Sequence, residues 1–288
     1  MMHFHTILTH PGGAHKDDFL ACCLMLSQQP VPVLRREPTP EDLADPGICV
    51  IDVGGEHVPE RLNFDHHQFH RNLAPTCSLS LVLQHLGLYE DARAFCTWLE
   101  PAEWFDARGP KQTAEWLGVD RDIIHRLNSP IDITMLRRFA LASSLEAGDP
   151  LWEIMRFIGE DLVDYLRSMR DRLDFIEEHS EFWELESEGE CFRALFLPRT
   201  NPLPDDPSMG LGQFIYSKGM ESKIAALVYP DRRGPGYGLT RFQDNPRLDF
   251  TRITDYADVH FTHAGGFVAK VSATEPDRLR ELAAAAWA

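Results

Sequence analysis

Apolar runs and helical patterns alternate through the first half of the chain, which is typical of an α/β sheet. Strand-like apolar runs are expected at 4–8, 31–34 and 48–53. Amphipathic helices are expected at about 18–27, at 78–87, from 90 to about 104, and within the weakly punctuated segment 111–146. Because polar clusters follow the strand-like runs, we expect ligand-binding residues at the carboxyl ends of the strands.

A long stretch with apolar residues at helical spacing begins at Leu151 and continues to about Trp183. It predicts a connecting helix between two domains; the alternative is that the stretch belongs wholly to one domain. The last third returns to strand-like runs, at 191–197, 223–229, 237–242, 259–263 and 267–271, before a helix that opens near 275. The pattern predicts an α/β fold with an N-terminal, mainly parallel-sheet domain at 1–150, a connecting helix at 151–185 and a smaller C-terminal α/β domain at 186–288.

The charge balance narrows the range of partners. The chain has 28 Lys and Arg against 45 Asp and Glu, a formal charge of −17. Tight, non-specific coating of long nucleic acid depends on phosphate neutralisation by Lys and Arg. The composition therefore favours a short nucleic acid or a small phosphorylated substrate held in a local pocket.

Nothing in the sequence indicates export or membrane insertion. No apolar stretch approaches the roughly 18 residues of a membrane span, and the N-terminus lacks a basic start followed by an apolar core. The six cysteines form no CxxC pair, so they are interpreted as reduced core residues. We expect a cytoplasmic protein with no membrane association, and a homodimer is compatible with the sequence.

The first polar cluster contains His10, His15 and Asp17, in a loop between the first strand and the first helix. A glycine pair inside the loop allows the backbone to fold these side chains around one point. The adjacent carboxylates Asp17 and Asp18 repel each other unless a cation or helix capping stabilises them. A lone surface histidine is a common alternative, but it would not explain the paired carboxylates.

The second and third clusters follow later strand-like runs. Asp52 follows the apolar residues 48–51 and precedes Gly54-Gly55. A buried carboxylate is costly unless it is paired or coordinated, although an aspartate before glycine also serves as a turn cap. In Asp65-His66-His67, one histidine can ligate a metal while its neighbour contacts a substrate oxygen or transfers a proton.

Asp106 and Asp132 compete for one further position in the site. Asp106 follows an apolar helix end and could complete the ligand set of a second metal, although taken alone it is a helix-terminal residue beside Arg108. Asp132 follows Pro130 and is better explained as a residue of a helix N-terminus.

The C-terminal segment His263-Ala-Gly265-Gly266-Phe267 is the remaining site candidate. Its glycines permit close backbone approach to an anion, although a glycine turn between strands needs no ligand. Basic residues that could hold substrate phosphates, or simply be solvated, are Arg232, Arg233, Arg241 and Lys270.

Imidazole mixed with several carboxylates suits Mn²⁺ or a similar divalent ion, and such sites commonly hold two ions. The residues therefore predict a metal-dependent phosphoester hydrolase. The expected cofactors are two divalent ions, Mn²⁺ in the first place and Mg²⁺ as the alternative.

The order of these motifs resembles the DHH phosphoesterase superfamily, which includes RecJ nucleases, nanoRNases and family II pyrophosphatases. More narrowly, it is similar to the MYG family of exonucleases. The matching segments are Thr9 to Asp18, Asp52 to Gly55, Asp65 to Gln68 and His263 to Phe267. The chain departs from the family in having Asp106-Ala-Arg-Gly where Asp-Asn-Gly is usual, and Val268-Ala-Lys270 where the family has a glycine-rich ending.

The resemblance implies a two-metal site in the N-terminal domain, a substrate-holding C-terminal domain and a cleft between them. The implied metal ligands are His10, His15, Asp17, Asp52, His66 and Asp106. The candidate catalytic residues are His67 and Asp65. The candidate substrate-binding residues are Arg241, His263, Gly265, Gly266 and Lys270.

We therefore expect hydrolysis of a phosphodiester in short single-stranded RNA or DNA, degraded from one end. The enzymatic alternative is a small-molecule phosphoesterase that acts on pyrophosphate, a cyclic dinucleotide or a phosphorylated nucleotide. A non-catalytic nucleotide-binding module is a third interpretation, which the intact set of ligand residues disfavours.

Overall fold

The structure, a computed structural model, describes residues 3–126 and 129–288. It divides into two compact units, 1–168 and 169–288, and helix α8 (Pro150–His179) contributes to both. Each unit has one six-stranded mixed sheet and helices, so the prediction of an α/β fold is confirmed. Residues 127–128, within the expected helical segment 111–146, lie outside the described residues. No described helix has the length and apolar character needed to cross a membrane.

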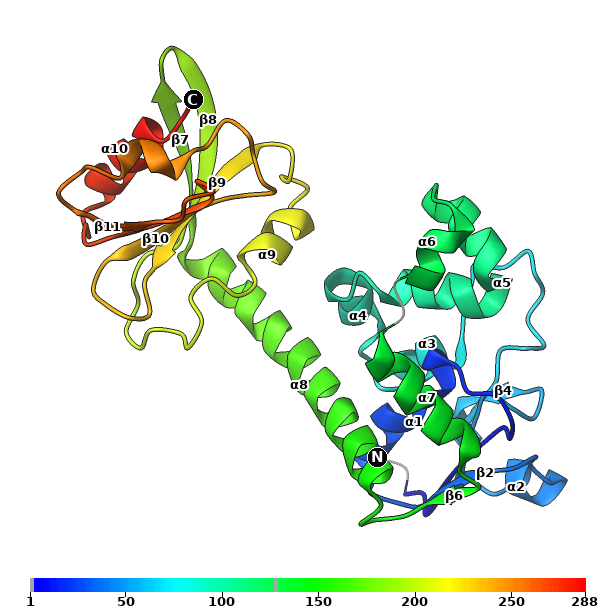
Figure 1. The fold of residues 1–288 in the computed structure, drawn as a ribbon. Helices are drawn as coiled ribbons and strands as arrows, with labels where there is room; N and C mark the ends of the chain where they lie inside the picture. The colour runs from blue at the N-terminus through cyan, green and yellow to red at the C-terminus, as the bar shows by residue number, and fades with distance from the viewer. Residues whose placement is uncertain (1–2, 127–128) are drawn as a thin grey trace. The chain divides into compact units, whose positions relative to one another are not determined.

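The sheet of the first unit has the order β4-β5-β3-β1-β2-β6 (Figure 1). Its inner strands are parallel, and the edge strands β4 and β6 pair antiparallel. The strands are β1 (Thr6–Thr9), β2 (Val33–Arg35), β3 (Ile48–Ile51), β4 (His57–Val58), β5 (Asn63–Phe64) and β6 (Ser144–Leu145).

Helices bury both faces of this sheet, as parallel strands require. The main core packs Ile7 and Ile51 against α1, α3 and the first half of α8. On the opposite face, Leu8 and Val50 pack with Leu43 of α2. The helices of this unit are α1 (Lys16–Gln28), α2 (Pro40–Ala44), α3 (Ser78–His85), α4 (Tyr89–Phe95), α5 (Leu99–Leu117), α6 (Arg121–Arg126) and α7 (Pro130–Leu141), with a 3₁₀ turn at Pro59–Arg61.

The second sheet has the order β11-β12-β10-β9-β8-β7 and is antiparallel except between β8 and β9. One face packs against α10 (Pro276–Ala285), and the other packs against α9 (Leu211–Ser217) and the end of α8. The strands are β7 (Glu181–Ser187), β8 (Glu190–Phe196), β9 (Ile224–Pro230), β10 (Tyr237–Arg241), β11 (Val259–Thr262) and β12 (Val268–Val271), with a 3₁₀ turn at Phe250–Ile253.

Helix α8 ends earlier than the predicted 151–185. It stops at His179, and Glu181 already begins strand β7. In this strand Trp183 and Leu185 are buried while Phe182 and Glu184 are exposed. The two-residue alternation that defines a strand therefore begins inside the segment that helical spacing assigned to the helix.

Gly159 of α8 lies where this helix packs against α1. A Cβ at this position would lie 1.9 Å from the carbonyl oxygen of Cys23. Replacing a helical glycine with alanine ordinarily stabilises a protein by about 1 kcal/mol. Here the backbone clash dominates, so we expect Gly159→Ala to lower the free energy of unfolding by about 2 kcal/mol or more. Urea denaturation measures the change, with Asp161→Ala, exposed on the same helix, as the control; an unchanged midpoint for Gly159→Ala would contradict the prediction.

Candidate functional site

The register of the first sheet brings the three sequence clusters to one edge. Thr9 pairs with Ile51, and Ile51 pairs with Phe64, in adjacent parallel strands. The next residues in the chain are therefore the first to leave the sheet at its carboxyl edge. They are His10, Asp52 and Asp65.

The N-terminus of α1 adds two buried carboxylates to this edge. Asp18 is a capping residue, because its Oδ1 accepts hydrogen bonds from the backbone N–H groups of His15 and Phe19, each at 2.8 Å. Its Oδ2 lies 3.2 Å from His10 Nε2. Negative charge is favourable at a helix N-terminus, so Asp18 needs no metal to be stable there.

Asp17 has no such stabilisation. Its side chain is buried, and both of its carboxylate oxygens lack a hydrogen-bond partner. Burial first, and then the negative charges of Asp52 and Asp106, raise the pKa of Asp17 well above its usual value. A buried carboxylate without donors is costly, and a bound cation would remove that cost. This observation shows that the residues fit a metal.

Asp52 projects its two oxygens toward different partners. Oδ1 lies 3.2 Å from His66 Nε2, and Oδ2 lies 3.5 Å from His10 Nε2. The backbone has a positive φ of 60°, a conformation that aspartate tolerates better than most residues. Ser78 Oγ, in the first turn of α3, donates a 2.6 Å hydrogen bond to Oδ1. The carboxylate is thus placed between two groups of potential ligands.

Asp106, on α5, is the aspartate that lies in this cluster. Its Oδ2 is 2.8 Å from His66 Nε2, and its Oδ1 is 3.6 Å from His15 Nδ1. Asp132 instead forms a capping box with Ser129, the N-cap of α7, and its Oδ1 lies 3.2 Å from Lys16 Nζ. Geometry therefore places Asp106, and not Asp132, with the other predicted ligands.

The predicted ligands form three overlapping groups in which the potential ligand atoms lie within 4.8 Å of one another. The groups overlap because His15 and Asp52 each belong to two of them. Among the described residues, the groups are His10 with His15 and Asp52, His15 with Asp17 and Asp106, and Asp52 with His66 and His67. The arrangement is a candidate metal-binding cluster of histidines and aspartates.

Asp65 orients its neighbours instead of facing a ligand group. Its Oδ2 accepts the N–H of Gly55 at 2.7 Å, and its Oδ1 lies 2.7 Å from Nδ1 of His67. Burial opposes ionisation of Asp65, but the hydrogen bonds from His67 and Gly55 outweigh it and lower the pKa to about 2. His67 is exposed, and the contact with Asp65 directs its Nε2 away from the carboxylate. A role for His67 toward substrate is compatible with this geometry.

Three buried residues behind the cluster, Arg35, Ser78 and Glu103, were not predicted from the sequence. Arg35 is buried, and its guanidinium donates to the carbonyl oxygens of Gly12, Gly13 and Phe139 at 3.3, 3.0 and 2.8 Å. It therefore holds the loop that carries His10 and His15. No local pattern distinguishes Arg35 from its exposed neighbour Arg36.

The second of these residues is Ser78, which donates to Asp52, and the third is Glu103. Glu103 is buried on α5, one turn before Asp106. It accepts hydrogen bonds from Ser80 Oγ at 2.6 Å and Tyr89 Oη at 2.9 Å, and Arg93 lies 3.1 Å away. The first turn of α3 thus contacts both Asp52, through Ser78, and the helix that carries Asp106.

The predicted substrate residues of the second unit do not form one set. Lys270 pairs with Gly238, and Arg241 lies an odd number of residues along the same strand. Because side chains alternate along a strand, Lys270 and Arg241 project from opposite faces of the sheet. Lys270 Nζ is 3.6 Å from Asp231 Oδ1, whereas Arg241 Nε is 3.4 Å from Asp244 Oδ1.

The glycine turn after β11 is compact. The N–H of Gly265 donates to Nδ1 of His263 at 2.9 Å, so the neutral ring carries its proton on Nε2, where it can be donated to a ligand. Gly266 has a positive φ of 68°, and a Cβ there would lie 2.2 Å from Asp249 Oδ1. Both features restrict Gly266 to glycine without requiring a substrate.

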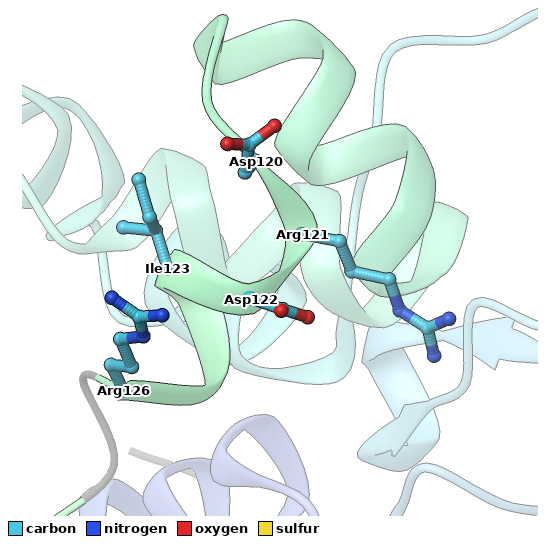
Figure 2. A pocket seen from close by; sticks show the side chains of 5 residues that line it. All are labelled: Asp120, Arg121, Asp122, Ile123 and Arg126. Carbon is cyan, nitrogen blue, oxygen red and sulfur yellow. The ribbon is translucent and has the colours of Figure 1, made fainter.

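A separate hollow of about 400 Å³ is lined by residues of α6 and its start, none of them from the histidine and aspartate cluster. In Figure 2 the side chains of Arg121 and Arg126 extend on opposite sides of the helix. The lining residues are Asp120, Arg121, Asp122, Ile123 and Arg126. This hollow has no convergent set of polar groups.

Comparison with known proteins matches the segment that forms most of the cluster. The model of an uncharacterised protein family, UPF0160 (MYG1_exonuc), matches residues 6–88. The chain is 38% identical over 95 residues to a protein of Rattus norvegicus named MYG1 exonuclease, which covers 27% of this chain and 24% of that protein. It is 45% identical over 62 residues to the Homo sapiens and Bos taurus proteins of the same name, which covers 21% of this chain and 16% of each of them.

The chain therefore spans a quarter or less of the length of these relatives. The matched residues run from β1 to just beyond α3 and include His10, Asp52 and the Asp65-His66-His67 triplet. Asp106 and the whole second unit lie outside them. These matches support a relationship of residues 6–88 to the MYG1 family.

Proposed function

We propose that this protein is a phosphodiester hydrolase that depends on two divalent metal ions and acts as an exonuclease on short single-stranded RNA or DNA. The observation that carries the proposal is Asp17, a buried carboxylate without a hydrogen-bond partner among three overlapping groups of ligand atoms. The names of the relatives and the resemblance to the DHH superfamily support the same chemistry. Mn²⁺ is the expected ion and Mg²⁺ the alternative.

Each residue of the cluster has a proposed role. Asp17, His66 and Asp106 would hold one ion and His10 the other, and the two residues that belong to two ligand groups, Asp52 and His15, would lie between the ions. Bound divalent ions at such a site activate a water nucleophile and stabilise charge on the leaving oxygen. His67, oriented by Asp65, would donate a hydrogen bond from Nε2 to a phosphate oxygen.

The second unit would supply contacts to the substrate. Arg241 and Lys270 project from opposite faces of their sheet. They therefore cannot both contact the same substrate phosphate. We propose Arg241 with the turn at 263–266 for this role, since backbone N–H of Arg241 donates to the carbonyl oxygen of Phe267 at 3.1 Å.

Hydrolysis of a labelled 5-mer RNA in the presence of Mn²⁺ tests the proposal, with a 5-mer DNA, pyrophosphate and a cyclic dinucleotide in parallel. Stepwise shortening is expected, and His67→Ala should lower its rate by about 10²-fold or more. His70→Ala is the matched control, because His70 is exposed in the same loop and belongs to none of the ligand groups. Turnover of pyrophosphate or the cyclic dinucleotide alone would replace the nuclease assignment with a small-molecule phosphoesterase, and no turnover of any substrate would contradict the proposal.

Metal binding should weaken as the pH falls. The hydrogen bond with Asp18 raises the pKa of His10 to about 9, although burial of the ring acts in the opposite direction. Burial also lowers the pKa of His66, but its contacts with Asp106 and Asp52 outweigh burial and raise that pKa above its usual value. Both rings are therefore protonated at neutral pH without metal, and each must lose a proton to become a ligand. With two protons released, we expect the apparent metal affinity to fall by up to about 100-fold per unit of pH between pH 8 and 6.

Titration calorimetry in buffers of different ionisation enthalpy counts the protons released in this reaction. A metal affinity that is constant from pH 6 to 8, with no proton release, would show that these histidines are not ligands.

A further inference from the structure

Another hollow in the first unit, of about 610 Å³, lies at the end of the sheet opposite the histidine and aspartate cluster. Its lining includes residues just before β1 and β5 and residues at the ends of α1 and α3. The cluster instead follows the carboxyl ends of the strands. We propose that this hollow, which we call the amino-edge pocket, is a second ligand site of the protein and binds a nucleoside monophosphate.

The floor of the amino-edge pocket is apolar and belongs to the core. Phe4, Met25 and Leu62 line it and are 3%, 2% and 1% exposed. Gln29 fixes one wall, because its Nε2 donates to the carbonyl oxygen of Phe4 and lies 2.7 Å from His3 Nδ1. Small-molecule sites are usually pockets of about 300–1,000 Å³ that combine apolar walls with a few polar groups. This floor can bury one face of a planar heterocycle such as a nucleobase.

The rim of the pocket offers both hydrogen-bond donors and acceptors. Gln28 Nε2 donates to Ser27 Oγ at 2.8 Å, and within the described part of the chain no group donates to Gln28 Oε1. Burial, and then the positive charge of His57, lower the pKa of His85. The His85 ring is therefore neutral at neutral pH and has one donor and one acceptor nitrogen. A mixed rim of this kind suits the edge of a nucleobase, which also carries both.

Arg167 gives the pocket a positive charge that the protein does not neutralise. It is exposed on α8 and forms no hydrogen bond or ion pair with any residue that the structure describes, Asp164 one turn earlier included. The lining contains no Asp or Glu, although the chain has 45 of them. Arginine is well suited to phosphate because its planar guanidinium can donate two hydrogen bonds at once. The pocket thus has a group for each part of a nucleoside monophosphate.

The amino-edge pocket is separate from the cluster. Asp17 lies in the first turn of α1, and Gln28 is the last residue of this helix. At a rise of about 1.5 Å per residue, the two are about 16 Å apart along the helix axis, which is too far for one mononucleotide to occupy both sites. Binding at the pocket therefore needs neither metal nor hydrolysis. A nucleoside monophosphate is also the product class of the proposed exonuclease, so the pocket can respond to accumulated product.

Titration calorimetry of the full-length chain with AMP, in the presence of a chelator, tests this inference. One AMP should bind per chain, and adenosine or inorganic phosphate should each bind about tenfold more weakly. Arg167→Glu should lower the affinity for AMP by about tenfold or more and leave that for adenosine unchanged. Gln28→Trp, which fills the pocket, should abolish binding of both. Arg137→Glu, exposed on α7, is the control, and circular dichroism verifies that each variant is folded.

Absence of AMP binding would overturn the inference, as would AMP binding that survives both Arg167→Glu and Gln28→Trp. Equal affinities for AMP and inorganic phosphate would show that the apolar floor takes no part and would also overturn it. Arg241→Ala should bind AMP as the wild type does, because loss of binding in this variant would place the nucleotide in the second unit. None of these results bears on the proposed hydrolase, since Mn²⁺-dependent shortening of the 5-mer RNA is measured separately.

Discussion

Asp52→Asn is expected to lower metal-dependent hydrolysis by about 10³-fold or more. The two carboxylate oxygens of Asp52 face His66 on one side and His10 on the other. Asparagine keeps one oxygen and replaces the other with a donor that cannot ligate a cation. Because asparagine also tolerates the positive φ of this position, the loss should come from the site and not from unfolding.

Ser78→Ala provides the graded comparison for Asp52→Asn. It removes the 2.6 Å hydrogen bond to Asp52 Oδ1 but keeps the carboxylate. Removing such a supporting contact typically lowers metal affinity or activity by about 10- to 100-fold, and Ser78→Thr should restore part of it. Single-turnover rates and metal affinities of the three variants measure these effects. An Asp52→Asn variant within tenfold of the wild-type rate would contradict a bridging role.

Asp17→Asn should stabilise the metal-free protein and at the same time remove its stabilisation by metal. Because the folded-state pKa of Asp17 is raised, the contribution of Asp17 to stability is present below its unfolded pKa and is lost as the pH rises through the folded pKa. At neutral pH the metal-free wild type therefore carries a cost that asparagine avoids. We expect the variant to be more stable by about 1 kcal/mol or more.

In saturating Mn²⁺ the wild type should instead be more stable than Asp17→Asn. An ion at 100 times its dissociation constant stabilises a folded protein by about 2.7 kcal/mol, and this gain should be absent from Asp17→Asn. Thermal unfolding in the presence of a chelator, and separately of Mn²⁺, measures the stability difference between the variant and the wild type under each condition. Asp161→Asn, exposed on α8, is the control. A variant less stable than the wild type in the chelator would indicate that Asp17 is stabilised by contacts within the protein.

The local features of the cluster could be predicted from the sequence because they depend on short stretches of chain. His10 and Asp52 each follow an expected strand-like run, and strands of a parallel sheet end at one edge; the two-residue strand β5 before Asp65 was not among the expected strands. The α/β class follows from the same alternation of patterns. The end of α8 was placed too late because apolar spacing near Trp183 fits a helix and a strand equally well.

The contacts that organise the cluster depend on residues far apart in the chain. Arg35 binds the carbonyl oxygen of Phe139, and Ser78 binds Asp52; nothing in the local sequence around either residue predicts its partner. The choice of Asp106 over Asp132 is of the same kind, because both are aspartates in helices and only packing decides which one reaches His66. In the second unit, the register of β10 with β12 separates Lys270 from Arg241.

The sequence alone determined which residue types could form a metal site and at which strand ends they lie, because hydrophobic period and local spacing are properties of the chain. Tertiary structure alone decided which carboxylates converge, which are neutralised by capping or by arginine, and which is left without a partner. The physical reason is that the cost of a buried charge depends on every group around it, and those groups come from α1, α3, α5, strand β2 and the segments that follow β1, β3 and β5.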